Sequence, residues 1–152
     1  MDDHDRSLAP RGRGAAKLIR DHLRKEKIAP EVVLCSSARR TQETLELIAP
    51  AWGPAAVVRV ERSLYGASAG QLLGRVQSVE DAIRSVMVIG HNPGLEDLAA
   101  ALAGDGVGDA LDRMAMKFPT AALAVFAVPT AWRDLAPGGA TLAAYVVPRD
   151  LG

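Results

Sequence analysis

The chain has 152 residues, with 18 Lys and Arg side chains against 18 Asp and Glu. A chain of this length is expected to form one domain, residues 1–152, with its own hydrophobic core. The neutral net charge argues against a protein that binds nucleic acid or acidic membranes. Cys35 is the only cysteine, which excludes an intrachain disulfide, and no apolar run is as long as a membrane span. A cytoplasmic protein is therefore expected.

The first predicted element is a helix over residues 10–28. Apolar residues between Ala15 and Leu23 recur at helical spacing, with Arg and Lys between them, and Pro10 suits a first-turn position. The run PEVVLCSS (30–37) follows as continuous apolar sequence that ends in small polar residues. Such a run predicts a strand that is buried on both faces.

Helical and strand-like segments then alternate. They are a helix over 40–48, the strand AAVVRVE (55–61), the helix SAGQLLGRVQSVED (68–81), the strand SVMVIG (85–90) and the helix NPGLEDLAAALAG (92–104). Pro93 and Gly94 open the last of these helices, and Gly104 can close it. Alternation of this kind predicts parallel strands joined by helices.

The end of the chain has a different pattern. TAALAVFAVP (120–129) and ATLAAYVVP (140–148) are two strand-like runs, joined across the turn residues Pro137-Gly138-Gly139. They predict a C-terminal antiparallel hairpin. The fold class is therefore α/β: a three-layer sandwich with a mainly parallel sheet, helices on both faces and this hairpin at the end.

Two of the predicted strands lead into chemically useful residues. The first ends at Ser36 and is followed by Arg39 and Arg40, and the strand over 85–90 is followed by His91. In parallel sheets, ligands bind beyond the carboxyl ends of the strands. The guanidinium fork of arginine matches phosphate oxygens, and histidine can donate, accept or hold a phosphoryl group. We expect one or both arginines and His91 to share one rim.

These residues resemble a known family. SSARRTQET (36–44) is similar to the S-x-x-x-R-x-x-x-T segment of the histidine phosphatase superfamily, and VIGHNPGLEDLA (88–99) is similar to its second histidine motif. DHDRSLAPRGRGAA (3–16) and SLYGASAGQLL (63–73) narrow the resemblance to the SixA-like phosphohistidine phosphatases. MKFPTAALAVF (116–126) resembles the closing strand of those domains. The resemblance covers nearly the whole chain, in the order of the family.

The resemblance implies roles for three residues. Arg40 corresponds to a phosphate-clamping arginine, His91 to the second active-site histidine, and Arg6 to a further phosphate-binding arginine. Arg40 and His91 are thereby the expected catalytic residues. Since Arg39 and Arg40 are adjacent, one is expected to point inward, and the motif spacing favours Arg40. Ser7 departs from the family's pattern, which has proline there.

The family's nucleophile is a histidine in an R-H-G or R-H-A motif that ends an apolar first strand. This sequence has no such strand, and His4 in DDHDR lacks both the preceding arginine and a strand to hold it. We expect the native polypeptide to start upstream of Met1 and to supply the strand and the nucleophile. Two alternatives remain: a pseudophosphatase that binds phosphate or a phosphoprotein without turnover, and a partner that supplies the strand.

The expected substrate is phosphohistidine on a protein. Superfamily members that act on phosphate esters carry an acid after the third strand to protonate the alkoxide, whereas ERSLYGASAG (61–70) has Glu61 too early and Tyr65 where an acid is sought. Imidazole is a better leaving group than an alkoxide and needs less help. A small-molecule phosphomonoesterase of the same superfamily is the further alternative. No cofactor is expected.

The other residues that could take part in catalysis or metal binding are expected to have structural roles. Cysteine-dependent phosphatases separate cysteine and arginine by five residues, but Thr41 occupies that position after Cys35, so Cys35 is expected to be a buried apolar residue. Tyr65 is expected to pack, and His22 to be exposed. The three histidines lack metal-ligand spacing, so no metal site is expected.

Overall fold

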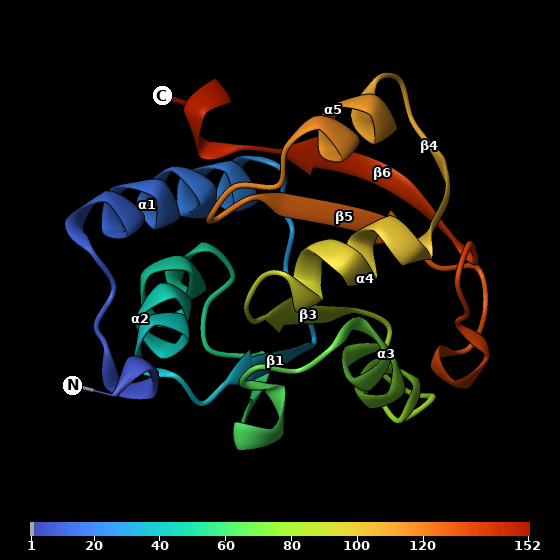
Figure 1. Ribbon diagram of the computed structural model, residues 1–152, viewed down its shortest axis with the longest axis horizontal. Coiled ribbons are helices and arrows are strands. Elements are labelled where there is room, and N and C mark those ends of the chain that lie inside the picture. The colour runs from blue at the N-terminus through green and yellow to red at the C-terminus, as the bar shows by residue number, and fades with distance from the viewer. Residues whose placement is uncertain (1) are drawn as a thin grey trace. The chain divides into compact units, whose positions relative to one another are not determined.

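The computed structural model describes residues 2–152, which form five α-helices and two three-stranded sheets (Figure 1). The predicted α/β class is confirmed. The chain divides into two compact units. The first runs to Gly66 and adds Ile83–His91 and Pro148–Gly152, and the second comprises Ala67–Ala82 and Asn92–Val147. Within residues 2–152, no helix combines the length and apolar character that crossing a membrane requires.

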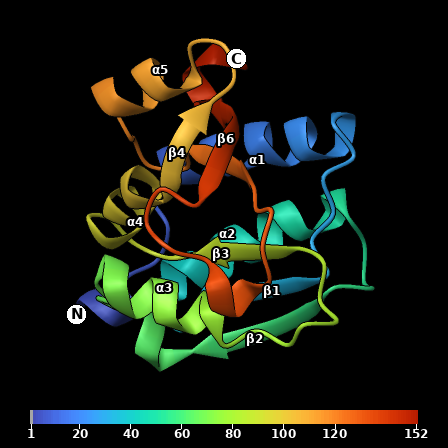
Figure 2. The same cartoon turned by 90° about the vertical axis from the view of Figure 1, so that its right-hand side faces the viewer.

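The sheet of the first unit is entirely parallel. Its central strand is β1 (Val32–Ser36), with β2 (Val57–Glu61) on one side and β3 (Val86–Ile89) on the other (Figure 2). All five residues of β1 are buried, as its continuous apolar run predicts. In register, Ser36 pairs with Glu61 and Cys35 with Ile89, so the three strands end at the same edge.

Two helices of the first unit pack against each other. Helix α1 (Pro10–Lys25) begins with Pro10, and helix α2 (Arg39–Ile48) packs against both α1 and β1. Glu43 of α2 ties the entry of α1 to this pair, because its carboxylate accepts hydrogen bonds from the Leu8 amide at 2.7 Å and the Arg13 guanidinium at 2.8 Å. The start of α1 is thereby held against α2.

The second unit has a mixed sheet. Its strands are β4 (Ala103–Gly106), β5 (Leu123–Ala127) and β6 (Ala140–Val146), and its helices are α3 (Ala69–Gln77), α4 (Gly94–Leu102) and α5 (Ala110–Met116). Strand β6 pairs with β5 antiparallel, as predicted, and with β4 parallel. The core contains Ala99, Ala110, Met114, Leu142 and Tyr145. Strand β4 and helix α5 were not predicted.

Cys35 lies in the core of the first unit with Val33 and Leu45. Burial raises the pKa of its thiol to about 11. Because the thiolate is the reactive form, we expect the folded protein to react with a thiol reagent such as DTNB only as fast as it opens. Stopped-flow absorbance with and without denaturant measures this. Complete reaction of the native protein within seconds would contradict the buried placement and reopen a chemical role for Cys35.

Candidate functional site

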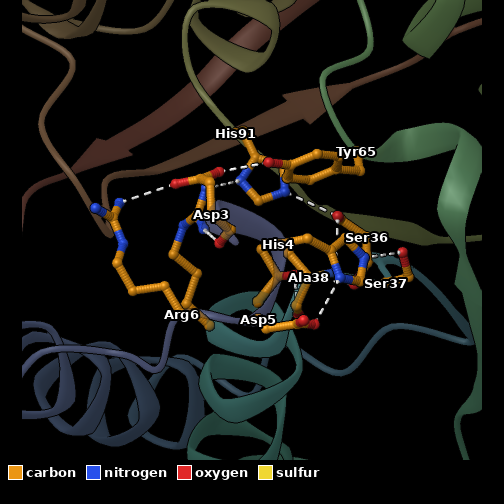
Figure 3. Close-up of polar contacts among 11 residues, drawn as sticks. Asp3, His4, Asp5, Arg6, Ser36, Ser37, Ala38, Tyr65 and His91 are labelled. Carbon is orange, nitrogen blue, oxygen red and sulfur yellow. Dashed lines mark hydrogen bonds and ion pairs between the residues drawn. The ribbon is translucent and has the colours of Figure 1, made fainter. Parts of the chain in front are cut away.

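The candidate site lies in the first unit, where segments that follow the parallel strands meet the start of the chain. Arg40 is in the first turn of α2, His91 follows β3, and Tyr65 follows the short 3-10 helix η3 (Arg62–Leu64). The 3-10 helix η1 (Asp3–Asp5) brings Asp3 to them (Figure 3). All of these residues come from loops or element ends, where ligand sites on parallel sheets are found.

Arg40 is the inward-facing arginine of the pair. Its Nη1 donates to the backbone carbonyl of Asp3 at 2.9 Å, and its Nη2 lies 3.2 Å from Asp3 Oδ2 and 3.3 Å from His91 Nδ1. Arg39 instead makes an ion pair with Glu43, with 3.6 Å between Nε and Oε2. The Arg40 side chain is 24% exposed and that of Arg39 55%. The guanidinium available to a ligand beside His91 is therefore that of Arg40.

The two neighbours of His91 define its tautomer. An arginine can only donate, so Nδ1 accepts the hydrogen bond from Arg40 and carries no proton. The neutral ring therefore has its proton on Nε2, which donates to Ser36 Oγ at 2.8 Å. Burial, followed by the positive charge of Arg40, lowers the pKa of His91 below its ordinary value of 6.5. His91 is consequently neutral at neutral pH when no phosphate is bound.

This environment gives a titration that NMR can follow. We expect the imidazole of His91 to titrate below 6.5, and its pKa to rise when Arg40 is replaced by alanine, because that change removes a positive charge and exposes the ring. The pH dependence of the ¹H–¹⁵N spectrum of imidazole nitrogens measures both values. A His91 pKa above 6.5 in the unsubstituted protein would contradict the described contacts.

Asp3 links the other charged groups of the site. Its Oδ2 receives hydrogen bonds from Arg40 and from the Tyr65 hydroxyl, while its Oδ1 lies 3.2 Å from Nη2 of Arg6 (Figure 3). The Tyr65 hydrogen bond, with smaller effects of Arg40 and Arg6, lowers the pKa of Asp3, so this carboxyl is ionised at neutral pH. Arg6 is 66% exposed, and its described ion pair is with Asp3.

His4 also lies in the site. Its Nε2 is 2.7 Å from Ser37 Oγ and its Nδ1 is 3.3 Å from Asp5 Oδ1. Its ring meets the Tyr65 ring edge-on at 4.9 Å, and Tyr65 meets the ring of His91 edge-on at 5.4 Å. His4 is thus held by side-chain contacts rather than by a strand, and its side chain is 16% exposed.

The loop between β1 and α2 supports both histidines. Ser36 and Ser37 are consecutive, and each hydroxyl contacts one histidine ring. The Ser36 hydroxyl oxygen also accepts a hydrogen bond from the Ala38 amide at 3.3 Å. Thr41 Oγ1 lies 2.9 Å from the carbonyl oxygen of Ser36 and 2.8 Å from that of Ala38, and both Ser36 and Thr41 are buried. The sequence segment SSARRTQET drew attention to these two serines, but it did not predict that they contact the two histidines.

The arrangement is suited to an anion with several oxygens. Two guanidinium groups, at Arg6 and Arg40, surround one carboxylate, and Arg40 lies in the first turn of a ten-residue helix, whose N-terminus favours negative charge. Tyr65 packs, as expected, but its hydroxyl also takes part in the site. His22, in the last turn of α1, is partly buried rather than fully exposed, so the expectation that it is exposed is wrong. In the described range 2–152, no group of three His, Cys, Asp or Glu side chains is placed to hold a metal ion.

Comparison with known proteins identifies the class. Residues 2–121 match the family model of the histidine phosphatase superfamily, branch 1. An uncharacterized protein of Mycobacterium tuberculosis is 40% identical over 149 residues, which cover 97% of this chain and 92% of that protein, and one of Mycobacterium leprae is 38% identical over 148 residues, 97% of this chain and 89% of that protein. The chain belongs to the histidine phosphatase superfamily.

Solved structures agree with this membership. A SixA structure from Nakamurella multipartitia matches with a TM-score of 0.85 and 33% identity, and covers 97% of this chain and 88% of that chain. A structure of the protein histidine phosphatase SixA complexed with tungstate matches with a TM-score of 0.78, covers 99% of this chain and 90% of that chain, and is 24% identical. The second likeness establishes the fold alone.

Proposed function

We propose that this chain acts as a phosphohistidine phosphatase, which removes phosphoryl groups from histidine side chains of another protein. The observation that supports this most strongly is that Arg6 and Arg40 bind one carboxylate, that of Asp3, while His91 binds Arg40. Carboxylate and phosphoryl oxygens offer arginine the same kind of acceptor. The place that the Asp3 carboxylate occupies is therefore suited to a phosphoryl group, in agreement with the chemistry of the superfamily.

In this proposal Arg6 and Arg40 neutralise the phosphoryl oxygens during an in-line attack. As the resemblance to the superfamily implies, a histidine of an Arg-His pair makes the attack in this proposal. A phosphorus–nitrogen bond forms on the attacking histidine as the one to the substrate imidazole breaks. Water then hydrolyses this phosphohistidine intermediate to inorganic phosphate.

His91 changes its protonation state during this cycle. A dianionic phosphoryl group favours the imidazolium form, so its arrival raises the pKa of His91 from the lowered value. Nδ1 then gains a proton, which it donates to a phosphoryl oxygen, where it stabilises charge in the transition state. The leaving nitrogen of the substrate imidazole takes a proton from solvent, so that the products are neutral imidazole and the phosphorylated enzyme.

The protonation state of Asp3 favours phosphohistidine over phosphate esters. A departing alkoxide needs a strong proton donor, but the Tyr65 hydrogen bond and the arginines keep Asp3 ionised. An ionised carboxylate cannot donate a proton. Imidazole leaves with much less assistance, because it accepts a proton readily near neutral pH. The expected substrate is therefore a phosphoramidate.

The test is phosphate release by the protein purified from its native cells. It is incubated with a phosphohistidine peptide and, in parallel, with phosphoserine and phosphotyrosine peptides of the same sequence. We expect release from phosphohistidine to be at least about tenfold faster, since the ionised Asp3 cannot protonate the departing alkoxide of an ester. Faster release from esters would favour a phosphomonoesterase. Binding of all three peptides without release would favour a phosphate-binding module without turnover.

A further inference from the structure

The phosphoryl site described above already contains an anion of the protein itself. Arg40 donates through Nη1 to the Asp3 backbone carbonyl and through Nη2 to the Asp3 carboxylate and His91. These contacts use both terminal nitrogens of the guanidinium. Asp3 thus occupies the fork formed by the two terminal nitrogens, and a phosphoryl group that binds to this fork must replace it.

The same carboxylate also engages the other positive group of the site. Asp3 Oδ1 pairs with Arg6 and Asp3 Oδ2 with Arg40, and the Tyr65 hydroxyl donates to Oδ2 as well. Donors from three separate segments thus converge on two oxygens, as they do around a bound oxyanion. Asp3 belongs to η1, a short element that begins at Asp3 itself and has no buried residues. Displacing Asp3 therefore exposes no residue of the hydrophobic core.

We propose that Asp3 is an internal competitor for the phosphoryl group: its carboxylate lies between Arg6 and Arg40 where phosphoryl oxygens bind, and it must leave when they arrive. This inference rests on the proposed function of the same site. With Asp3 in place, the two arginines and the carboxylate carry a net charge of +1, from two positive groups and one negative group. Without its charge, the net charge facing a dianion is +2.

Competition of this kind has a consequence for turnover. Inorganic phosphate, the product, has only the contacts of the site itself, with Arg6, Arg40 and His91, so the returning Asp3 carboxylate promotes its release. A phosphoryl group carried by a protein makes further contacts outside the arginines and can displace Asp3 more easily. Asp3 therefore acts as a specificity-determining residue, which disfavours free phosphate relative to a phosphorylated protein.

The experiment compares Asp3→Asn with the unsubstituted chain and with Asp5→Asn, using tungstate and inorganic phosphate as probes in calorimetry at constant ionic strength. The asparagine side chain keeps the shape and one acceptor oxygen of the carboxylate but loses its charge. Asp5 is a matched control, because its substitution removes the same charge from the same element and its described partner is His4, not an arginine. We expect Asp3→Asn to bind both anions about tenfold more tightly, and Asp5→Asn to change the affinity by less than about twofold.

Each other outcome overturns the inference in a recognisable way. Equal affinity of Asp3→Asn and the unsubstituted chain would leave the phosphoryl site standing and remove the competition. Weaker binding by Asp3→Asn would make Asp3 an organiser of the arginines. Undetectable binding by all three proteins would overturn the proposed function together with the inference. A second variant, Asp3→Ser, repeats the comparison with a smaller side chain if Asp3→Asn does not fold.

Discussion

Replacing Arg40 with alanine is expected to lower the affinity for tungstate about 100-fold, whereas Arg39→Ala is expected to change it by less than about twofold. The two residues are adjacent and carry the same charge, but their side chains point to different partners. Arg40 contacts Asp3 and His91, while Arg39 pairs with Glu43 on the surface of α2. Only Arg40 can offer a two-pronged hydrogen bond at the site.

Calorimetric titration at two salt concentrations measures this difference. The loss in Arg40→Ala should persist at high salt, because it removes specific hydrogen bonds rather than a diffuse field. Similar losses in both variants that disappear in salt would mean that tungstate responds to the general charge of this region. That result would contradict the assignment of Arg40.

Thr41→Val is expected to lower the free energy of unfolding by about 1–3 kcal/mol. The two side chains have nearly the same shape, so the substitution removes the hydroxyl and little else. That hydroxyl lies between the carbonyl oxygens of Ser36 and Ala38, in a buried position. Valine would leave these acceptors without their side-chain donor and would loosen the segment that carries the hydroxyl bound by His91.

Thr44→Val is the matched control. Thr44 lies in the same helix and its Oγ1 donates to the Arg40 carbonyl at 2.9 Å, on a side chain that is only partly buried. Water can replace that hydrogen bond, so we expect a change within about 0.5 kcal/mol. Urea unfolding followed by circular dichroism compares the two variants. Equal stability of Thr41→Val and Thr44→Val would contradict the role of Thr41 in bracing the loop.

The elements that the sequence predicts well are those with a strong local pattern. The continuous apolar run before Ser36 predicts the buried strand β1, and the turn residues 137–139 predict the antiparallel pair β5 and β6. Helix α5 has seven residues and buries only Ala110 and Met114, which leaves little periodicity to detect. Strand β4, with the sequence AGDG, has no strand-forming side chains and is defined by its pairing with β6.

The contacts of the site also fall into those that the sequence predicts and those that it does not. That Arg40 and His91 should be close follows from the sequence, since both come after strands that run in the same direction, and their side chains lie 3.3 Å apart. The places of Asp3 and Tyr65 do not follow, because contacts between positions 62 residues apart set them. No local pattern encodes such contacts. Arg40→Ala tests the role of Arg40 in phosphate binding, and the roles of Arg6 and His91 stay predictions.

The most direct measurement is a crystal structure of the protein with tungstate, located by the anomalous scattering of tungsten. We expect one ordered tungstate whose oxygens lie within hydrogen-bond distance of the Arg40 guanidinium and of His91, with the Asp3 carboxylate displaced from between Arg6 and Arg40. Tungstate bound elsewhere, with the Asp3 contacts to both arginines intact, would contradict the claim that these residues form a phosphoryl-binding site.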